Sequence, residues 1–215
     1  MRILAADTAL GGLSVAVLED EKILSHHFQE MERGHAEALA PLVQDTMAEA
    51  GLGFADLDRL AVTTGPGTFT GQRVGLAFMR GLRVALKKPL TGITTLEAMA
   101  AATENAKAAA IHDAKRDEAY LLLWENGATI FAPAVMPVAE ALEKIRAFGS
   151  CTLAGTGAPA AAEQLGHGFV LSAIRQPDAL WVARLARAMS VPQDAPGPLY
   201  LRAPDAKLPG GKALV

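Results

Sequence analysis

Residues 59–94 read RLAVTTGPGTFTGQRVGLAFMRGLRVALKKPLTGIT, and this stretch decides the fold class. The run RLAVTT (59–64) is apolar without alternating polar residues, as is typical of a strand covered on both faces. The glycine-rich GPGTFTG (65–71) turns the chain into a segment with apolar residues at helical spacing, and Pro89–Ile93 is typical of the next strand. A strand–helix–strand unit predicts a parallel sheet with helices against its faces.

The residues upstream predict three strands and a helix. Arg2–Asp7 is an apolar run, Leu13–Val17 alternates apolar with smaller residues, and Ile23–Phe28 opens a third strand after a charged turn. The short turns between them predict an antiparallel meander. Apolar residues at helical spacing over 34–51 predict a helix, and Pro41 either delays its regular part or kinks it.

The downstream half repeats this order in a shorter form. After a helix over 95–105, the pattern restarts near Lys107 with three strands, a helix, a strand and a helix, over 108–113, 120–124, 129–135, 139–148, 151–154 and 179–189. The fold class is therefore α/β, a duplicated βββαβαβα arrangement that resembles the actin-like superfold, with a shortened second half. We expect subdomains at 1–105 and 106–200 and a tail at 201–215. Pro, Gly and charged residues from Pro192 onward predict partial mobility.

The composition excludes several classes of protein. A chain of 215 residues with 51% hydrophobic and 20% charged residues is not disordered in its main state. Its net charge of −3 lacks the strong positive balance of an autonomous nucleic-acid-binding protein. Cys151 is the sole cysteine, which excludes an internal disulfide and a cysteine-rich zinc site. Without a secretory signal or an uncharged stretch long enough to span a membrane, we expect a cytoplasmic protein.

Three turns could approach a nucleotide in an actin-like fold. Asp7 and Thr8 follow the first strand with Ser14 across the hairpin, Asp113 ends the first strand of the second half, and Gly155-Thr156-Gly157 would lie on the adenosine side. Glycines permit close backbone approach, and short polar side chains orient phosphate. Because Asp, Thr and Gly are favoured at any turn, nucleotide binding stays open on these residues alone.

The glycine-rich segment GPGTFTGQRVG (65–75) could place an anion at a helix N-terminus, but it lacks the Gly-Lys-Ser/Thr of a P-loop. Gly71 and Gly75 lie one helical turn apart, which favours close packing of another helix over phosphate binding. The five histidines do not assemble at metal-ligand spacing. Cys151 lies in an apolar stretch, which predicts an inert buried thiol.

Six segments together resemble the TsaB family, also called YeaZ. They are DTA (7–9), RGHAEALAPLV (33–43), GPGTFTGQRVGLAFMRGL (65–82), PLTGITTLEAMA (89–100), DAKRDEAY (113–120) and PLYLRAPDAK (198–207). The resemblance covers most of the chain. It implies an actin-like-fold partner of the enzyme TsaD in making threonylcarbamoyladenosine beside the anticodon of tRNAs that read ANN codons. The family's complex also includes the ATPase TsaE, and TsaC supplies threonylcarbamoyl-adenylate.

One departure from TsaD bears on catalysis. TsaD is similar over these glycine-rich and GITTLEAM segments, where it carries two metal-binding histidines four residues apart. Thr95 and Met99 stand at the matching positions here. Two imidazoles on one helix face can hold a metal, whereas a hydroxyl and a thioether are poor substitutes. The comparison with TsaD therefore implies no catalytic residue, no metal site and no cofactor, with a nucleotide possible at the boundary with TsaD.

The resemblance also implies a partner surface. The helices over 34–51 and 71–86 would pair with the same helices of TsaD, or with a second copy of the chain when TsaD is absent. Ten candidates for this surface are His35, Leu39, Leu42, Val43, Thr68, Phe69, Gln72, Gly75, Leu76 and Met79. A helix that is apolar around most of its girth is covered on two sides, by its sheet and by a partner or a larger internal core. Contact with tRNA is expected only through the complex, and none with a membrane.

Two functions stay open on the residues. One is a non-catalytic scaffold that activates TsaD. The other is an autonomous actin-like ATPase or kinase, or with less support a peptidase, motivated by Asp7, Asp113 and the 155–157 loop. Lys115 and Arg116 follow Asp113, but no cation follows Asp7, so phosphate-binding charge would come from one turn only.

Overall fold

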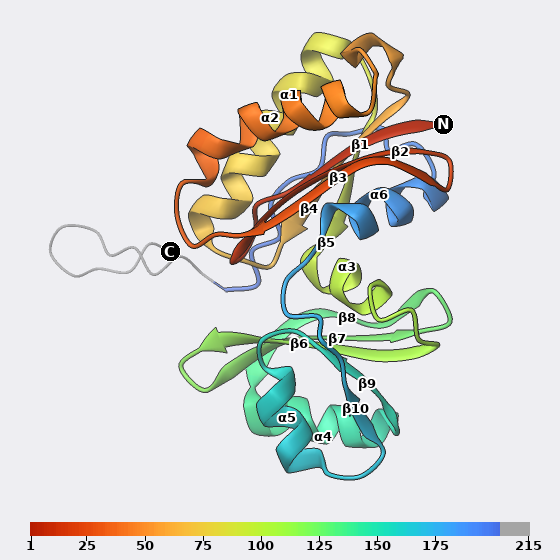
Figure 1. Cartoon of the computed structure of the whole chain (residues 1–215). Helices are drawn as coiled ribbons and strands as arrows, with labels where there is room; N and C mark the ends of the chain where they lie inside the picture. The colour runs from red at the N-terminus through yellow and green to blue at the C-terminus, as the bar shows by residue number, and fades with distance from the viewer. Residues whose placement is uncertain (203–215) are drawn as a thin grey trace, which may run out of the picture.

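The computed structural model describes residues 1–202, which form two five-stranded sheets with helices between and outside them (Figure 1). The first sheet has the order β3-β2-β1-β4-β5, and the second has the order β10-β9-β6-β7-β8. The strands of the first sheet are β1 (Arg2–Asp7), β2 (Gly12–Glu19), β3 (Lys22–Glu30), β4 (Arg59–Gly65) and β5 (Leu90–Thr94). Those of the second are β6 (Lys107–Lys115), β7 (Glu118–Glu125), β8 (Ala128–Pro137), β9 (Cys151–Ala154) and β10 (Phe169–Leu171).

The strand pairing confirms the expected meander and parallel unit. β1 pairs antiparallel with β2, and β2 with β3, whereas β1 pairs parallel with β4, and β4 with β5. Every residue of β4 is buried, as its uninterrupted apolar pattern predicts. The second sheet repeats this plan, because β6 pairs antiparallel with β7 and parallel with β9. The duplicated actin-like arrangement is therefore confirmed.

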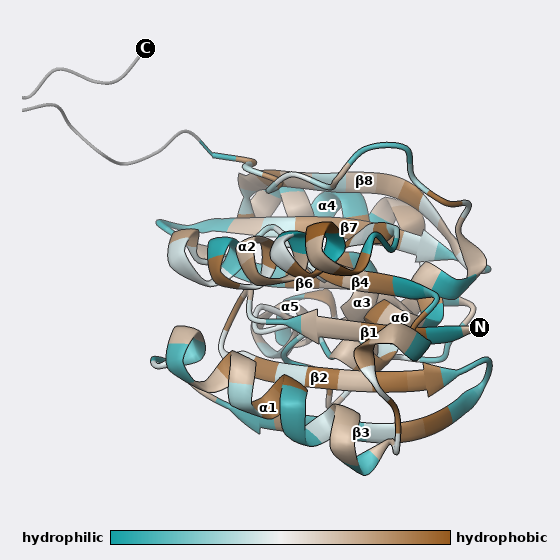
Figure 2. Ribbon diagram, turned by 90° about the horizontal axis from the view of Figure 1, so that it is seen from above, coloured by the Kyte–Doolittle hydropathy of each residue, from teal (hydrophilic) through white to brown (hydrophobic). Residues whose placement is uncertain are grey.

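Helices α1 (His35–Glu49) and α2 (Phe69–Leu86) cover one face of the first sheet. α1 begins at His35 after Gly34, whose φ of 90° suits glycine, and continues through Pro41 without interruption. α2 begins at Phe69 and is capped by Thr68, whose Oγ1 accepts a hydrogen bond from the N–H of Gly71. Figure 2 shows hydrophobic and hydrophilic segments alternating along both helices, as expected of helices with one face on a sheet. A short 3₁₀ turn (Phe54–Asp56) leads from α1 into β4.

Each half ends in a helix that packs against the sheet of the other half. α3 (Thr95–Ala101) follows β5, yet its Leu96 and Met99 share a core with strands β6 and β7 of the second sheet. α6 (Ala179–Ala188) closes the second half, yet its Val182 and Ala183 pack on β1 and β2. Figure 1 shows α3 and α6 between the two sheets. The two halves therefore share their inner cores.

The second half contains two elements that the sequence pattern did not predict. α5 (Ala158–Leu165) and β10 follow β9, so the full βββαβαβα order is present. The expected shortening lies in their size, because α5 has 8 residues against 18 in α2, and β10 has 3 against 5 in β5. α4 (Val138–Phe148) and α5 cover the outer face of this sheet.

The segment after α6 returns to the first sheet. The N–H of Leu199 donates to the carbonyl of Thr64, and Pro196 lies so close to Gly92 that a Cβ there would be 2.6 Å away. Arg202 bonds to the Ala114 carbonyl. These contacts hold Pro196, Leu199 and Arg202 against the rest of the fold, and the partial mobility expected from Pro192 stays a prediction. Of the expected tail at 201–215, residues 203–215 lie outside the described residues. The boundaries 1–105 and 106–200 stay a prediction. No helix within residues 1–202 is long and apolar enough to cross a membrane.

Candidate functional site

The turn after β1 holds a carboxylate sealed from solvent. Asp7 is fully buried, and its Oδ1 accepts hydrogen bonds from Thr63 Oγ1 at 2.5 Å and from the N–H of Ala9 at 3.1 Å. Its Oδ2 is buried with no hydrogen-bond partner among residues 1–202. Burial raises the pKa of Asp7 to about 7, although the two hydrogen bonds act in the opposite direction. Asp7 is thus the actin-like turn acid by position, but it cannot reach a ligand in solution.

Glycines of the 65–75 segment close over this turn. A Cβ at Gly67 would lie 2.2 Å from the Ala9 carbonyl oxygen, and one at Gly71 would lie 2.2 Å from that of Thr8. Thr8 Oγ1 donates to the Gly71 carbonyl at 2.7 Å and accepts from the N–H of Gly75 at 3.0 Å. Close packing, which the sequence favoured over phosphate binding, is confirmed. Its partner is a turn of the same chain and not another helix, because the turn after β1 lies beneath the start of α2.

The equivalent turn of the second half is open. Lys115 Nζ donates to Asp113 Oδ2 at 2.7 Å, and the lysine side chain is 82% exposed. Hydrogen bonding to Lys115 lowers the pKa of Asp113. Thr156 Oγ1 accepts from the N–H of Asp113 and lies 3.2 Å from Nδ1 of His112. Burial lowers the pKa of His112 to about 4, so its imidazole is neutral at pH 7.

A cleft of about 310 Å³ separates the two halves beside this open turn. Its walls include Gly11, Gly67 and Thr68 of the first half and His112, Asp113, Lys115, Tyr120 and Thr156 of the second. Of the six residues expected at nucleotide-side turns, Asp113 alone lines this cleft. Asp7, Thr8 and Ser14 are at most 1% exposed. Nucleotide binding therefore stays a prediction, with one of its expected residues facing the cleft.

The other expected nucleotide-side residues hold the fold together. Ser14 Oγ accepts a hydrogen bond from the N–H of Ala179, where α6 begins. A Cβ at Gly155 would lie 2.2 Å from the carbonyl oxygen of Ile111, and the N–H of Gly157 donates to that oxygen at 3.1 Å. These glycines let the end of β9 approach β6, which is a packing role.

Six of the ten residues expected at a partner surface are buried inside the chain: Leu39, Val43, Gln72, Gly75, Leu76 and Met79. Four of them belong to the core between the first sheet and helices α1 and α2. These side chains are enclosed by their own chain in this structure, and their place at a partner surface stays a prediction. At Gly75 an added Cβ would lie 2.6 Å from Thr8 Oγ1, so this glycine serves internal packing.

The remaining four candidates reach the surface. Phe69 is 50% exposed and Thr68 is exposed, while His35 and Leu42 are half-buried. His35 and Thr68 line a hollow of about 450 Å³ between the starts of α1 and α2. Their role at a partner surface stays a prediction.

The outer face of α2 is exposed and contains none of the ten candidates. Ala77, Gly81, Val84 and Ala85 are exposed, Val84 by 73%, and a Cβ at Gly81 would meet nothing within 4 Å. At about 100° per residue, these positions lie roughly opposite the buried Met79. Small apolar side chains here form an open helix surface. In the second half of α2, the larger Phe78, Met79 and Leu82 pack toward the core, whereas Ala77, Gly81 and Ala85 are exposed.

The positions that match the metal histidines of TsaD are part of the core. Thr95 Oγ1 donates to the Pro66 carbonyl at 2.7 Å, and Met99 is fully buried. Within residues 1–202, no group of three or more His, Cys, Asp or Glu side chains is placed to hold a metal ion. His26 and His27 point to opposite faces of the sheet, toward Asp178 and Glu49 respectively.

The family described as "TsaD: tRNA N6-adenosine threonylcarbamoyltransferase" matches residues 22–170. The tRNA threonylcarbamoyladenosine biosynthesis protein TsaB of Escherichia coli is 40% identical over 100 residues, which are 46% of this chain and 43% of that protein. YeaZ from Pseudomonas aeruginosa is 29% identical with a TM-score of 0.77, over 93% of this chain and 99% of that one. The chain belongs to the TsaB (YeaZ) family.

Two further comparisons place this TsaB-family chain. A second Pseudomonas aeruginosa structure, described by its similarity to peptidase YeaZ, is 29% identical, with a TM-score of 0.79 over 94% of this chain and 99% of that one. The activator of 2-hydroxyisocaproyl-CoA dehydratase from Clostridium difficile is 12% identical with a TM-score of 0.51, over 85% of this chain and 93% of that one. That is a likeness of fold alone. The chain spans less than half of the Escherichia coli protein in its alignment.

Proposed function

We propose that this chain is a non-catalytic partner of a TsaD-type enzyme, together with TsaE, in the cytoplasmic synthesis of threonylcarbamoyladenosine in tRNA. The observation that carries the proposal is membership of the TsaB family, since the Escherichia coli relative is named for this pathway. The match of residues 22–170 to the family described as the transferase supports a common fold for the chain and that enzyme.

The state of the two turns supports a non-catalytic role. Asp7 is sealed by the chain's own glycine segment, and Asp113 is paired with Lys115. A catalytic base must come within hydrogen-bond reach of the substrate, which Asp7 cannot do in this conformation. Thr95 and Met99 are buried in the core. By the resemblance to TsaD, they stand at the positions of that enzyme's metal-binding histidines.

The outer face of α2 supports a helix-pairing role. Ala77, Gly81 and Ala85 are small and exposed, so a helix of another protein can approach the backbone of α2 closely. Val84, which is 73% exposed, adds apolar area to this surface. Half-buried Leu42 of α1 lies in the same helical layer.

The proposal is tested by reconstitution. Purified TsaD-type enzyme, TsaE and an ANN-reading tRNA are supplied with threonylcarbamoyl-adenylate, with or without this chain. We expect modified tRNA to form many times faster with the chain present, measured by mass spectrometry of nucleosides. Equal rates with and without it would overturn the proposal.

The docking surface has its own test. Gly81→Trp fills open space on α2 and should abolish co-purification with the TsaD-type enzyme while leaving the melting temperature within a few degrees of wild type. Ala147→Trp, on exposed α4, is the matched control and should retain the partner. Analytical ultracentrifugation of the same variants checks self-association of the chain alone.

The autonomous ATPase or kinase remains the alternative, favoured only by Asp113, Lys115 and Thr156 at the cleft. Calorimetry of the isolated chain with ATP and Mg²⁺ separates the two functions. Tight binding with turnover would support the alternative, and no heat of binding would leave the scaffold role.

A further inference from the structure

A row of basic residues on α2 carries positive charge that no ion pair among residues 1–202 neutralises. Residues 59–96 contain six of the 20 basic residues and none of the 23 acidic ones. Five of the six lie on or just after α2, and we name them the basic edge: Arg73, Arg80, Arg83, Lys87 and Lys88. No ion pair within residues 1–202 involves any of the five. An acidic protein thus carries a local excess of positive charge along one helix.

Helix geometry aligns these charges on one side of α2. Arg73, Arg80 and Lys87 are seven residues apart, which is close to two turns, so they share one face. At 1.5 Å per residue the three span about 21 Å, which matches roughly six nucleotides of a strand at 3.4 Å each. This face is offset from Val74, Phe78 and Leu82, which pack toward the core of α1 and α2. Ala77 and Val84 of the proposed protein-docking face lie within about 40° of Arg73 around the helix, so the basic edge directly borders that face.

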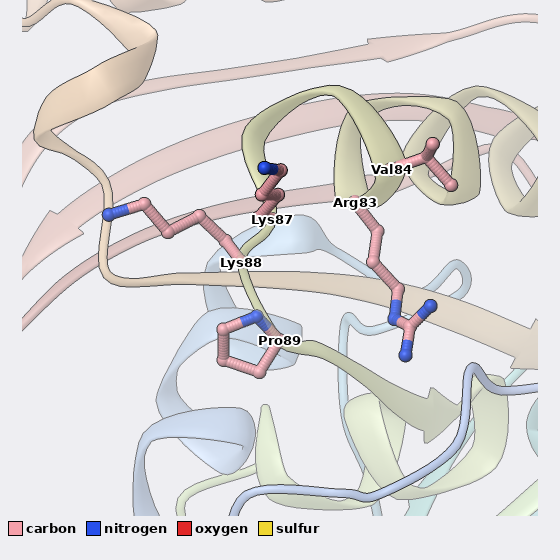
Figure 3. Close-up of a pocket in the computed structure, with 5 residues that line it drawn as sticks. All are labelled: Arg83, Val84, Lys87, Lys88 and Pro89. Carbon is pink, nitrogen blue, oxygen red and sulfur yellow. The ribbon is translucent and has the colours of Figure 1, made fainter.

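The side chains at the far end of the basic edge do not converge on one small ligand. Arg83, Lys87 and Lys88 surround a hollow of about 310 Å³ with Val84 and Pro89 (Figure 3). Figure 3 shows Lys88 extending to one side of Pro89 and Arg83 to the other. A single phosphate or carboxylate requires donors that point at one place. Cations that fan out instead fit a polyanion with charges spread along its length.

Aromatic rings stand at the other end of the basic edge. The Arg73 guanidinium lies 3.4 Å from the Phe69 ring centroid, and the rings of Phe69 and Tyr200 are stacked with centroids 6.0 Å apart. Arg73 Nε also donates to the Tyr200 hydroxyl at 2.8 Å. Phe69 and Tyr200 remain 50% and 43% exposed. Unstacked RNA bases bind on aromatic side chains and guanidinium planes. An acidic protein surface has no unstacked bases that could stack on these rings.

We propose that the basic edge, with Phe69 and Tyr200 at its end, binds the phosphate backbone of the tRNA substrate. This inference rests on the proposed function and assigns a direct RNA contact to this chain within the complex. The small net charge of −3 explains why such a contact would depend on the complex, since one helix supplies only part of the charge.

The test uses the complex of this chain with the TsaD-type enzyme and a fluorescein-labelled ANN-reading tRNA transcript. Fluorescence anisotropy gives Kd over a range of salt concentrations for wild type and for the triple variant R80Q/R83Q/K87Q. We expect Kd to rise about tenfold or more at low salt, and the slope of log K against log salt to fall by about two, because three phosphate contacts are lost. F69A should weaken binding at all salt concentrations without changing the slope.

The matched control is K22Q/K144Q/R146Q, which removes the same charge from positions away from α2. It should change Kd less than twofold. Equal losses in both triple variants would show a general charge effect and overturn the inference. Unchanged binding by R80Q/R83Q/K87Q would overturn it as well, as would loss of the TsaD-type partner, which would make the basic edge a protein contact. If wild type never joins the enzyme but binds tRNA through the basic edge, the proposed function fails and the inference stands.

Discussion

The two acidic residues at corresponding strand ends of the duplicated fold differ in burial. Asp7, at the end of β1, has 0% exposure beneath three glycines, whereas Asp113, near the end of β6, forms an exposed ion pair with Lys115. The same position in the repeat is therefore a packing joint in one half and an open surface in the other. A polar turn residue gains its role from what covers it, and here the cover comes from residues about 60 positions away.

The largest expected loss of stability comes from a substitution that disrupts the packing of the buried turn after β1. Gly71→Ala brings a Cβ to within 2.2 Å of the Thr8 carbonyl oxygen, so we expect a loss of about 3 kcal/mol in the free energy of unfolding. Gly81→Ala is the matched control on the same helix, where an added Cβ meets nothing within 4 Å. It should stabilise by about 0.5–1 kcal/mol, because alanine favours the helix. Urea denaturation measures both, and equal effects would contradict the asymmetry.

The next effect is a pH dependence from Asp7. Its folded pKa of about 7 exceeds the unfolded value, so the folded state holds the extra proton and stability falls as pH rises from about 4 to 7. Asp7→Asn removes this fall and should gain about 4 kcal/mol on wild type between pH 4 and pH 8, since each pKa unit corresponds to about 1.4 kcal/mol.

His112 is the control with the opposite sign. Its folded pKa of about 4 lies below the unfolded value, so its contribution is complete above about pH 6.5 and is lost as pH falls toward 4. His112→Gln should flatten that slope and leave the Asp7 slope in place. Parallel pH profiles for the two variants would contradict the assignment.

The smallest effect belongs to the open turn. Asp113→Asn removes an exposed ion pair with Lys115, which costs about 0.5 kcal/mol or less at pH 7. Because the pKa of Asp113 is lowered in the folded state, that small contribution is present at neutral pH and vanishes as pH falls through the folded pKa. Thermal melts at pH 7 and pH 3 check it. A loss as large as that of Gly71→Ala would show that this turn is also a packing joint.

Local patterns predicted the strands better than the surfaces. β1 to β5 follow from apolar runs and turn residues, and these are short-range signals. α5 and β10 were missed because Ala, Gly and Pro between 155 and 168 carry weak periodicity. The candidate partner surface includes buried residues because α2 is apolar around most of its girth, and only the packing on the sheet decides that Met79 turns inward while Ala77 and Gly81 stay outside. The sealing of Asp7 depends on a contact between distant segments, which no local pattern encodes.

The crossed helices α3 and α6 have a consequence for how the chain matures on the ribosome. The inner face of the first sheet, with Ile3, Ala5 and Ala16, is completed only by Ala179–Ala188 of α6. More than 170 residues must emerge after β1 before this apolar face is covered. The apolar inner face of the N-terminal half therefore stays exposed until the last helix of the C-terminal half has been synthesised. We therefore expect the two halves to complete their cores together and not as two domains folded one after the other.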